Sequence, residues 1–311
     1  MVGVNQTIHD QAVIFGAGQN LVGIVTQPID YQPGERPVFV ILNSGIVHRV
    51  GHHRMYVALA RTLARLGHQV LRFDLSGVGD SDVRSDGLTL LDSVLADVRE
   101  AADWLASTRQ ARRFIMIGLC SGADHSLVYG VSDPRVCGLV LLDPSIPPTR
   151  GYYLRYACRH LIRPGSWLKL FVGGGRLRTK IRKLLGSTQA DPWEPHRLNL
   201  NNPMIREFLL NTYQRSMELG MQCLAVFTSG FPHQHNYRRQ ILDAFPTVPF
   251  GDRLRLEYFA GCDHVFTSEP DRARLFAIIL EWVTHAAFAT QRAATAVAEQ
   301  DVETECPVYE F

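Results

Sequence analysis

One stretch of the chain decides the fold: Phe114-Ile115-Met116-Ile117-Gly118-Leu119-Cys120-Ser121-Gly122-Ala123. Its apolar beginning predicts a buried strand, and a helical pattern over 124–131 follows, so the order is strand, tight turn, helix. Glycines stand two places before and two places after Cys120, where a sharp turn brings the backbone close to its neighbours. With Ser121 at the centre instead, Leu119 would occupy a position that needs a small residue. The stretch therefore predicts a reactive Cys120 on a strained turn.

Strand and helix patterns alternate on both sides of this turn. Strands are predicted at 12–15, 21–25, 38–42, 69–73, 114–118, 136–142, 224–227 and 254–259. Helical patterns lie at 55–66, 91–107, 124–131 and 271–288. The first two strands flank a short Gly/Asn turn and predict an antiparallel hairpin. The alternation of apolar strands with helices predicts an α/β fold with a mostly parallel, doubly wound sheet.

The alternation stops in residues 145–221, which show no strand pattern but contain helical stretches, several prolines and three consecutive glycines. A helical insertion between two strands of a parallel sheet is typical of a lid above the carboxyl ends of the strands, where ligands bind. We therefore expect a core formed by 1–144 and 222–290, an inserted helical lid at 145–221, and a flexible tail at 291–311.

The composition is ordinary for a globular enzyme. The 311 residues are 46% hydrophobic and 20% charged, and the formal net charge of +2 does not suggest a nucleic-acid partner. There is no signal-peptide pattern and no apolar window long enough for a transmembrane segment, so we expect a soluble, cytoplasmic protein. The six cysteines lack the CxxC spacing of zinc or redox sites, and we expect no metal and no cofactor.

Two residues that follow predicted strands are candidate partners of Cys120. His264 lies after the last strand and can accept the proton of a thiol at neutral pH. The loop after the strand 224–227, the commonest place for a triad acid, offers no carboxylate. Asp143 follows the preceding strand, at an alternative acid position, and could orient the imidazole. Two other interpretations stay open: Asp143 caps a turn, or the cysteine and histidine work without an acid.

An oxyanion hole requires backbone N–H groups near the nucleophile. One is expected from Ser121, directly after Cys120, and the other from the loop after the strand 38–42, with Ile46 as the candidate. Several histidines lie near the predicted strand ends: His48, His52, His53, His125, His233 and His235. They lack the spacing of zinc ligands, so a metal site is not predicted.

Three segments together resemble a known group of enzymes. They are Val50-Gly51-His52-His53-Arg54, Leu71-Arg72-Phe73-Asp74-Leu75-Ser76-Gly77-Val78-Gly79-Asp80-Ser81, and the glycine-flanked turn at Cys120. Over roughly residues 12–285 the chain resembles the exosortase-A-associated hydrolases, bacterial α/β-hydrolases of the serine-aminopeptidase-like superfamily. Its cysteine resembles that of dienelactone hydrolases, which use a Cys–His–Asp set but are shorter and lack this lid. The resemblance implies an α/β-hydrolase fold and a bacterial acyl-processing enzyme, although the loop after Gly230 lacks the usual aspartate.

The predicted lid is strongly basic. It has no Asp or Glu between positions 144 and 190. Between positions 150 and 183 it contains ten Lys or Arg: Arg150, Arg155, Arg159, Arg163, Lys169, Arg176, Arg178, Lys180, Arg182 and Lys183. Of these, Arg176, Arg178 and Arg182 are the candidate substrate-binding residues. A cationic amphipathic surface fits an acidic carrier protein, a phosphate-bearing thioester such as an acyl-coenzyme A, or peripheral contact with an anionic membrane. A solvated helix face is the alternative.

These features predict acyl chemistry through a thioester on Cys120, with His264 as the general base. Water as the acceptor would make the protein an ester or thioester hydrolase, which is the leading interpretation. An amine, alcohol or carbon nucleophile as the acceptor would make it an acyltransferase or cyclase of a biosynthetic pathway. A non-catalytic ligand-binding protein on the same fold is the third possibility.

Overall fold

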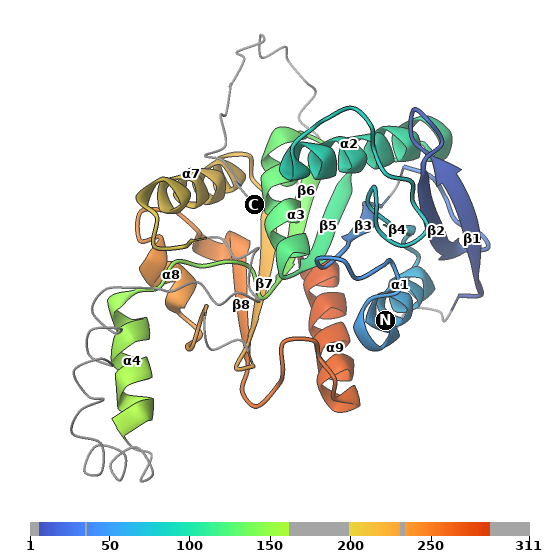
Figure 1. The fold of residues 1–311 in the computed structure, drawn as a ribbon. Coiled ribbons are helices and arrows are strands. Elements are labelled where there is room, and N and C mark those ends of the chain that lie inside the picture. The colour runs from blue at the N-terminus through green and yellow to red at the C-terminus, as the bar shows by residue number, and fades with distance from the viewer. Residues whose placement is uncertain (1–5, 35, 162–198, 231–233, 287–311) are drawn as a thin grey trace, which may run out of the picture.

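Figure 1 shows the protein as a computed structural model, in which residues 6–34, 36–161, 199–230 and 234–286 are described. Their strands form one sheet in the order β1-β2-β4-β3-β5-β6-β7-β8. β2 is antiparallel to β1 and β4, and the other neighbouring strands are parallel. The predicted mostly parallel sheet is therefore confirmed. The strands are β1 (Ile8–Phe15), β2 (Leu21–Pro28), β3 (Val38–Leu42), β4 (Val70–Phe73), β5 (Phe114–Leu119), β6 (Val136–Leu142), β7 (Gln222–Thr228) and β8 (Leu254–Phe259).

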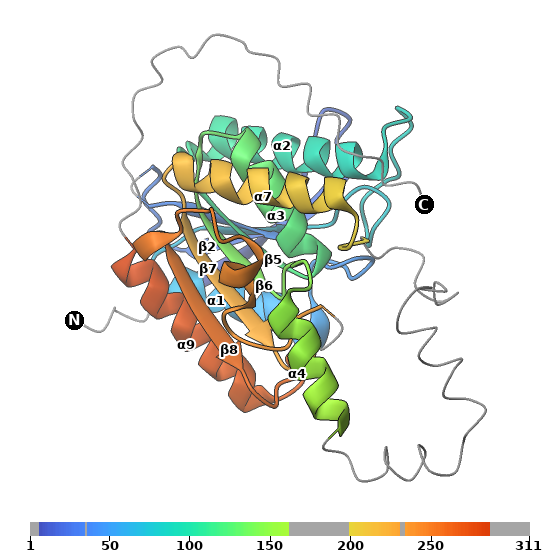
Figure 2. The ribbon, with the colours of Figure 1, turned by 90° about the vertical axis from the view of Figure 1, so that its left-hand side faces the viewer.

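Helices cover both faces of the sheet (Figures 1 and 2). One face carries α1 (Met55–Arg65) and α9 (Glu269–His285), and the other carries α2 (Leu90–Arg109), α3 (Ser121–Ser132) and α7 (Pro203–Glu218). The shorter elements are α4 (Arg150–Leu161), α8 (Gln240–Ala244) and the 3-10 turns η1 (His52–Arg54) and η2 (Gly251–Arg253). Within the described ranges, no helix is both long enough and apolar enough to cross a lipid bilayer.

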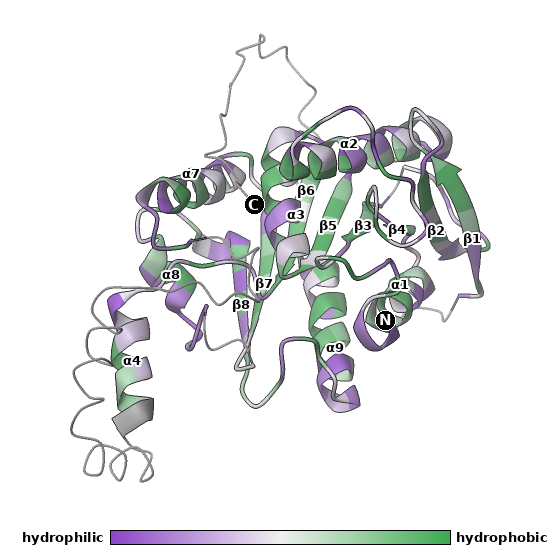
Figure 3. Cartoon of the chain, in the orientation of Figure 1, coloured by the Kyte–Doolittle hydropathy of each residue, from purple (hydrophilic) through white to green (hydrophobic). Residues whose placement is uncertain are grey.

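Successive side chains of a strand point to opposite sides of the sheet. Because helices cover both sides, the side chains of the central strands are buried on both faces. In β3, Val38, Val40 and Leu42 join the core cluster beneath α2, α3 and α7, whereas Phe39 and Ile41 join the cluster beneath α1 and α9. Figure 3 shows the resulting hydrophobic centre of the molecule. This two-sided burial explains why the strand could be recognised from a continuous apolar run.

The structure differs from the predicted domain boundaries at α7. The sequence predicts a lid over 145–221 that includes this segment, but Leu209, Tyr213 and Met217 of α7 are at most 2% exposed and belong to the core beside α3. Helical periodicity alone does not distinguish a helix that covers the sheet from a helix of a lid. α4, in contrast, projects from the body of the molecule in both views (Figures 1 and 2). Residues 162–198 lie outside the described residues.

Candidate active site

Cys120 stands at the sharp turn between β5 and α3, with φ 56° and ψ −123°. A non-glycine residue in such a backbone conformation costs on the order of 1–3 kcal/mol, so its surroundings must hold it there. One restraint is the Cys120 amide, which donates a hydrogen bond to the carbonyl of Leu142 at 2.9 Å and ties the turn to β6. The Cys120 side chain is half-buried. It is therefore held in place and remains accessible.

Two glycines allow this turn to exist. A Cβ atom on Gly118 would lie 2.0 Å from the carbonyl carbon of Gly122. A Cβ atom on Gly122 would lie 2.4 Å from the carbonyl oxygen of Asn43, in the loop after β3. The obstructing atoms belong to the backbone, so no side-chain rotation can relieve either clash. The spacing seen in the sequence thus reflects close contact between three backbone segments.

His264, in the loop between β8 and α9, connects Cys120 with Asp143. Its Nδ1 lies 2.8 Å from Oδ2 of Asp143, and its ring also forms a hydrogen bond with the Cys120 thiol. Burial disfavours the charged imidazole, but the hydrogen bonds to Asp143 and Cys120 outweigh it and raise the pKa of His264 to about 9. The structure therefore brings together the three residues that the sequence proposed as a triad.

Asp143 is fully buried at the end of β6, with a φ of 46°. The backbone amide and the hydroxyl of Thr228 each donate to its carboxylate at 2.6 Å, the first to Oδ1 and the second to Oδ2. Nε2 of His235 lies 3.0 Å from Oδ1. Burial opposes the ionisation of Asp143, but its contacts with His235, His264 and Thr228 lower its pKa. The carboxylate thus faces the segments after β7 and β8 rather than capping a local turn.

His235 is a residue of this site that was not predicted from the sequence, where it stood only as one of several histidines without the spacing of metal ligands. It lies in the segment after β7, is 0% exposed, and packs edge-on against Phe227 with 4.9 Å between ring centroids. That segment is the usual place of a triad acid, and here it supplies an imidazole that contacts the acid. The only sequence signal was a segment without carboxylate but with two histidines. The spacing of residues in the sequence could not show that His235 of this segment reaches Asp143 at the end of β6.

The predicted oxyanion loop does lie against the turn. The amide of Gly45 donates to the hydroxyl oxygen of Ser121 at 2.8 Å. The side chain of Ile46, the residue proposed for the second N–H group, is 93% exposed. The contact that connects this loop to the turn at Cys120 is therefore made by the neighbour of Ile46. The Ser121 amide lies at the beginning of α3, where helix N–H groups lack partners within the helix.

The end of the same loop contacts the loop that carries His264. His53 and Arg54 both have positive φ angles, 50° and 59°. Nε2 of His53 lies 3.2 Å from the hydroxyl oxygen of Thr267. Burial and the nearby His264 lower the pKa of His52. Within the described ranges, no group of three or more His, Cys, Asp or Glu side chains is arranged to hold a metal ion.

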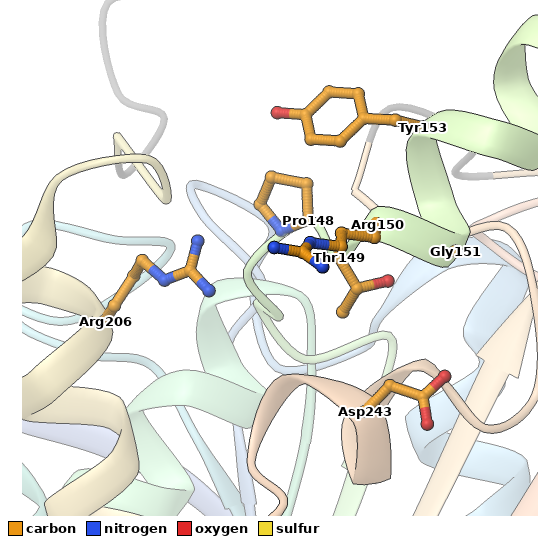
Figure 4. A pocket seen from close by; sticks show the side chains of 7 residues that line it. All are labelled: Pro148, Thr149, Arg150, Gly151, Tyr153, Arg206 and Asp243. Carbon is orange, nitrogen blue, oxygen red and sulfur yellow. The ribbon is translucent and has the colours of Figure 1, made fainter.

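A pocket of about 560 Å³ opens beside the start of α4. Figure 4 shows Arg150 of α4 and Arg206 of α7 reaching toward one another across it. Among the described residues, no carboxylate pairs with either arginine. Asp243 accepts a hydrogen bond from the Tyr237 hydroxyl at 2.6 Å, and that hydroxyl is 2.7 Å from the hydroxyl of Thr149. The pocket is lined by Pro148, Thr149, Arg150, Gly151, Tyr153, Arg206 and Asp243.

The other predicted substrate-binding residues are Arg176, Arg178 and Arg182, and they lie outside the described residues. The structure therefore places two different arginines together. Arg150 is one of the basic residues of the predicted lid, whereas Arg206 is not among the predicted site residues. Arg206 could not be found from the sequence, because only the folded chain brings this residue of α7 to the pocket at the start of α4.

The sheet order, the glycine-flanked turn after β5 and the histidine after the last strand define an α/β-hydrolase fold. The chain belongs to the serine aminopeptidase S33 family, whose model matches residues 40–229. Serine is the usual nucleophile of these hydrolases, whereas Cys120 stands at the apex of the turn here. A comparison with curated proteins finds no match.

Similar solved structures include the esterase Pf2001 of Pyrococcus furiosus, with a TM-score of 0.56 and 14% identity over 91% of this chain and 97% of that one. A dienelactone hydrolase of Anabaena variabilis has a TM-score of 0.55 and 14% identity over 89% and 98%. The meta-cleavage product hydrolase CumD of Pseudomonas fluorescens has a TM-score of 0.51 and 16% identity over 88% and 97%. At these identities the likeness establishes the fold alone.

The close approach at Gly122 gives a prediction for stability. Gly122→Ala should lower the free energy of unfolding by about 2 kcal/mol or more, because overpacking against an atom that cannot move typically costs 1–3 kcal/mol. Gly18→Ala is the control, since its added Cβ would meet nothing nearer than a side-chain oxygen at 3.5 Å. Urea unfolding monitored by circular dichroism measures both variants. Equal stabilities of the two variants would contradict the described geometry.

Proposed function

We propose that the protein is an acyl hydrolase that cleaves an ester or thioester through an acyl-Cys120 intermediate. The observation that carries this proposal is the arrangement of Cys120, His264 and Asp143. An accessible thiol on a strained turn forms a hydrogen bond with an imidazole, and a buried carboxylate contacts the other side of that imidazole. This is the geometry of a nucleophile, a proton carrier and a residue that orients it.

The reaction begins with the attack of the Cys120 sulfur on the acyl carbonyl. With a pKa of about 9, His264 is mainly protonated at neutral pH, and a cation beside a thiol favours the nucleophilic thiolate. The sulfur–carbon bond forms, the bond to the leaving group breaks, and the proton on His264 passes to the leaving oxygen or sulfur. The products of this half-reaction are an acyl-Cys120 thioester and a released alcohol or thiol.

Hydrolysis of the thioester completes the cycle. His264, now neutral, acts as the general base and removes a proton from water while the oxygen attacks the acyl carbon. The thioester bond breaks, which releases the carboxylic acid and restores the thiolate beside the protonated His264. The Ser121 amide and an amide of the loop at Ile46 are proposed to hold the negative oxygen in both steps. The contact between Gly45 and Ser121 supports this by holding the loop beside the turn.

The pocket beside α4 supports an anionic substrate. Two guanidinium groups that face one another repel each other where, as among the described residues, no carboxylate pairs with either, and an anion between them would remove that repulsion. A phosphate group carries about −1.5 to −2 charges at neutral pH and matches the fork of donors on arginine. The pocket follows Asp143 along the chain by only a few residues. We therefore favour a phosphate-bearing acyl thioester, such as an acyl-coenzyme A, as the substrate class.

The proposed nucleophile and base can be tested by substitution. Cys120→Ala and His264→Ala should each lower kcat by at least about a thousandfold, and the double variant should be little worse, because members of a triad act as a unit. Cys158→Ala removes an exposed cysteine of α4 and is the matched control. Full activity of Cys120→Ala, or losses that multiply in the double variant, would contradict the proposal. Assays with and without an amine acceptor show whether water is the acceptor.

The substrate charge gives a second test. Replacing both Arg150 and Arg206 by Gln should raise KM about tenfold for an acyl-coenzyme A, while KM for the neutral N-acetylcysteamine thioester of the same acyl group stays unchanged. Added salt should mimic the substitution in the wild type, since the Debye length is about 8 Å at physiological ionic strength. Arg215→Gln is the control, because Arg215 lies on α7 like Arg206 but is paired with Glu218 at 3.4 Å. Equal responses of the two thioesters would refute this substrate class.

A further inference from the structure

The buried carboxylate of Asp143 contacts two histidines, one at each oxygen. His264 lies 2.8 Å from Oδ2, and His235 lies 3.0 Å from Oδ1. Thr228 adds one donor to each oxygen, its amide to Oδ1 and its hydroxyl to Oδ2. The side chains of Asp143 and His235 are both 0% exposed, so water does not replace a contact that is lost. Asp143 therefore depends on protein donors for its orientation and charge.

The orientation of this carboxylate is not fixed by its own covalent geometry. The terminal torsion of an aspartate side chain has broad minima, so neighbouring groups must hold the plane of the carboxylate. An ionised carboxylate can only accept hydrogen bonds, and Nε2 of His235 can meet it only as a donor. The Thr228 amide and His235 hold Oδ1 together, which leaves Oδ2 directed at His264.

We propose that His235 is a positioning residue of this site, which holds Asp143 ionised and in the orientation that receives His264. The inference rests on the proposed function, because the kinetic effect of His235 passes through Asp143 and His264. It adds to that function a fourth residue, supplied by the segment after β7. A segment that usually carries the triad acid here supports an acid that stands after β6.

The pH dependence follows from the groups that face Asp143. His235 comes from the segment after β7, and His264 and Cys262 come from the loop after β8. Burial, together with the surrounding carboxylates, raises the pKa of Cys262 to about 12, so this thiol stays neutral. Removing the imidazole of His235 takes away a contact that lowers the pKa of Asp143. The Asp143 carboxylate should then be protonated at a higher pH than in the wild type.

The test compares His235→Leu, which removes the donor, with His235→Gln, whose side-chain amide can stand where Nε2 stood. His235→Leu should lower kcat at neutral pH about tenfold with little change in KM, and should move the acid limb of the pH–rate profile upward by about one unit. His235→Gln should restore most of both quantities. His68→Leu is the matched control for the kinetic readouts, because His68 is another buried histidine and its Nδ1 lies 3.3 Å from the carbonyl oxygen of Pro37 rather than from a carboxylate.

The loss of unfolding free energy between pH 7 and acid, measured by urea unfolding monitored by circular dichroism, gives a readout that needs no catalysis. A carboxylate whose pKa is depressed by folding stabilises the folded state above its unfolded pKa, and that stability disappears as the pH falls through its folded pKa. Because His235→Leu brings the folded pKa of Asp143 closer to its unfolded value, the free energy of unfolding should fall less from pH 7 into acid in His235→Leu than in the wild type. If the leucine variant does not fold, His235→Gln and the shorter His235→Asn make the comparison, with Gln alone resembling the wild type.

An unchanged acid limb and an unchanged loss of stability in acid in His235→Leu would overturn the inference, and so would an equal shift of the acid limb in His68→Leu. A glutamine variant as impaired as the leucine variant would also overturn it. The failure of the proposed function looks different. In that case Cys120→Ala would keep its activity, while His235→Leu would still lose less unfolding free energy in acid than the wild type.

Discussion

The backbone at Cys120 imposes the constraint on which the rest of the site depends. A residue with φ 56° and ψ −123° is held where β5, α3 and the loop after β3 meet so closely that neither Gly118 nor Gly122 can carry a side chain. This contact places the Cys120 side chain at the carboxyl edge of the sheet. The parallel strands β6 and β8 end at the same edge, and the residues after them meet there: Asp143 contacts His264, and His264 forms a hydrogen bond with the thiol.

The electrostatics of the site follow from burial. Asp143 is enclosed, yet the contacts from His235, His264 and Thr228 keep its pKa low, and the charge of Asp143 in turn favours the protonated form of His264. With a cysteine at the turn, a protonated imidazole suits the resting site, because the thiolate is the reactive form. With the serine usual in this family, a neutral imidazole would be needed to remove the proton from the hydroxyl. The exchange of serine for cysteine and the raised pKa of His264 are thus consistent with one another.

Much of this arrangement could be predicted from the sequence, because local rules govern it. Three features can each be recognised from a few neighbouring residues: the apolar run at β3, the glycines around Cys120 and the histidine after the last strand. Contacts between distant segments could not be predicted. The packing of α7 beside α3, the approach of His235 to Asp143 and the convergence of Arg150 with Arg206 all depend on how loops return to the sheet. The position of Asp143 after its strand could be predicted, but the sequence does not distinguish a turn cap from a partner of His264.

The central claim is that Cys120 forms a covalent acyl intermediate, and mass spectrometry tests it most directly. The protein is mixed with an activated acyl thioester, quenched in acid within one turnover, and analysed first intact and then as peptides. We predict one acyl group per chain, located on Cys120 and released by neutral hydroxylamine as expected of a thioester. An acyl group on the neighbouring Ser121 that resists neutral hydroxylamine would contradict the claim. Hydrolysis of the thioester by the protein without any detectable acyl adduct would contradict it as well.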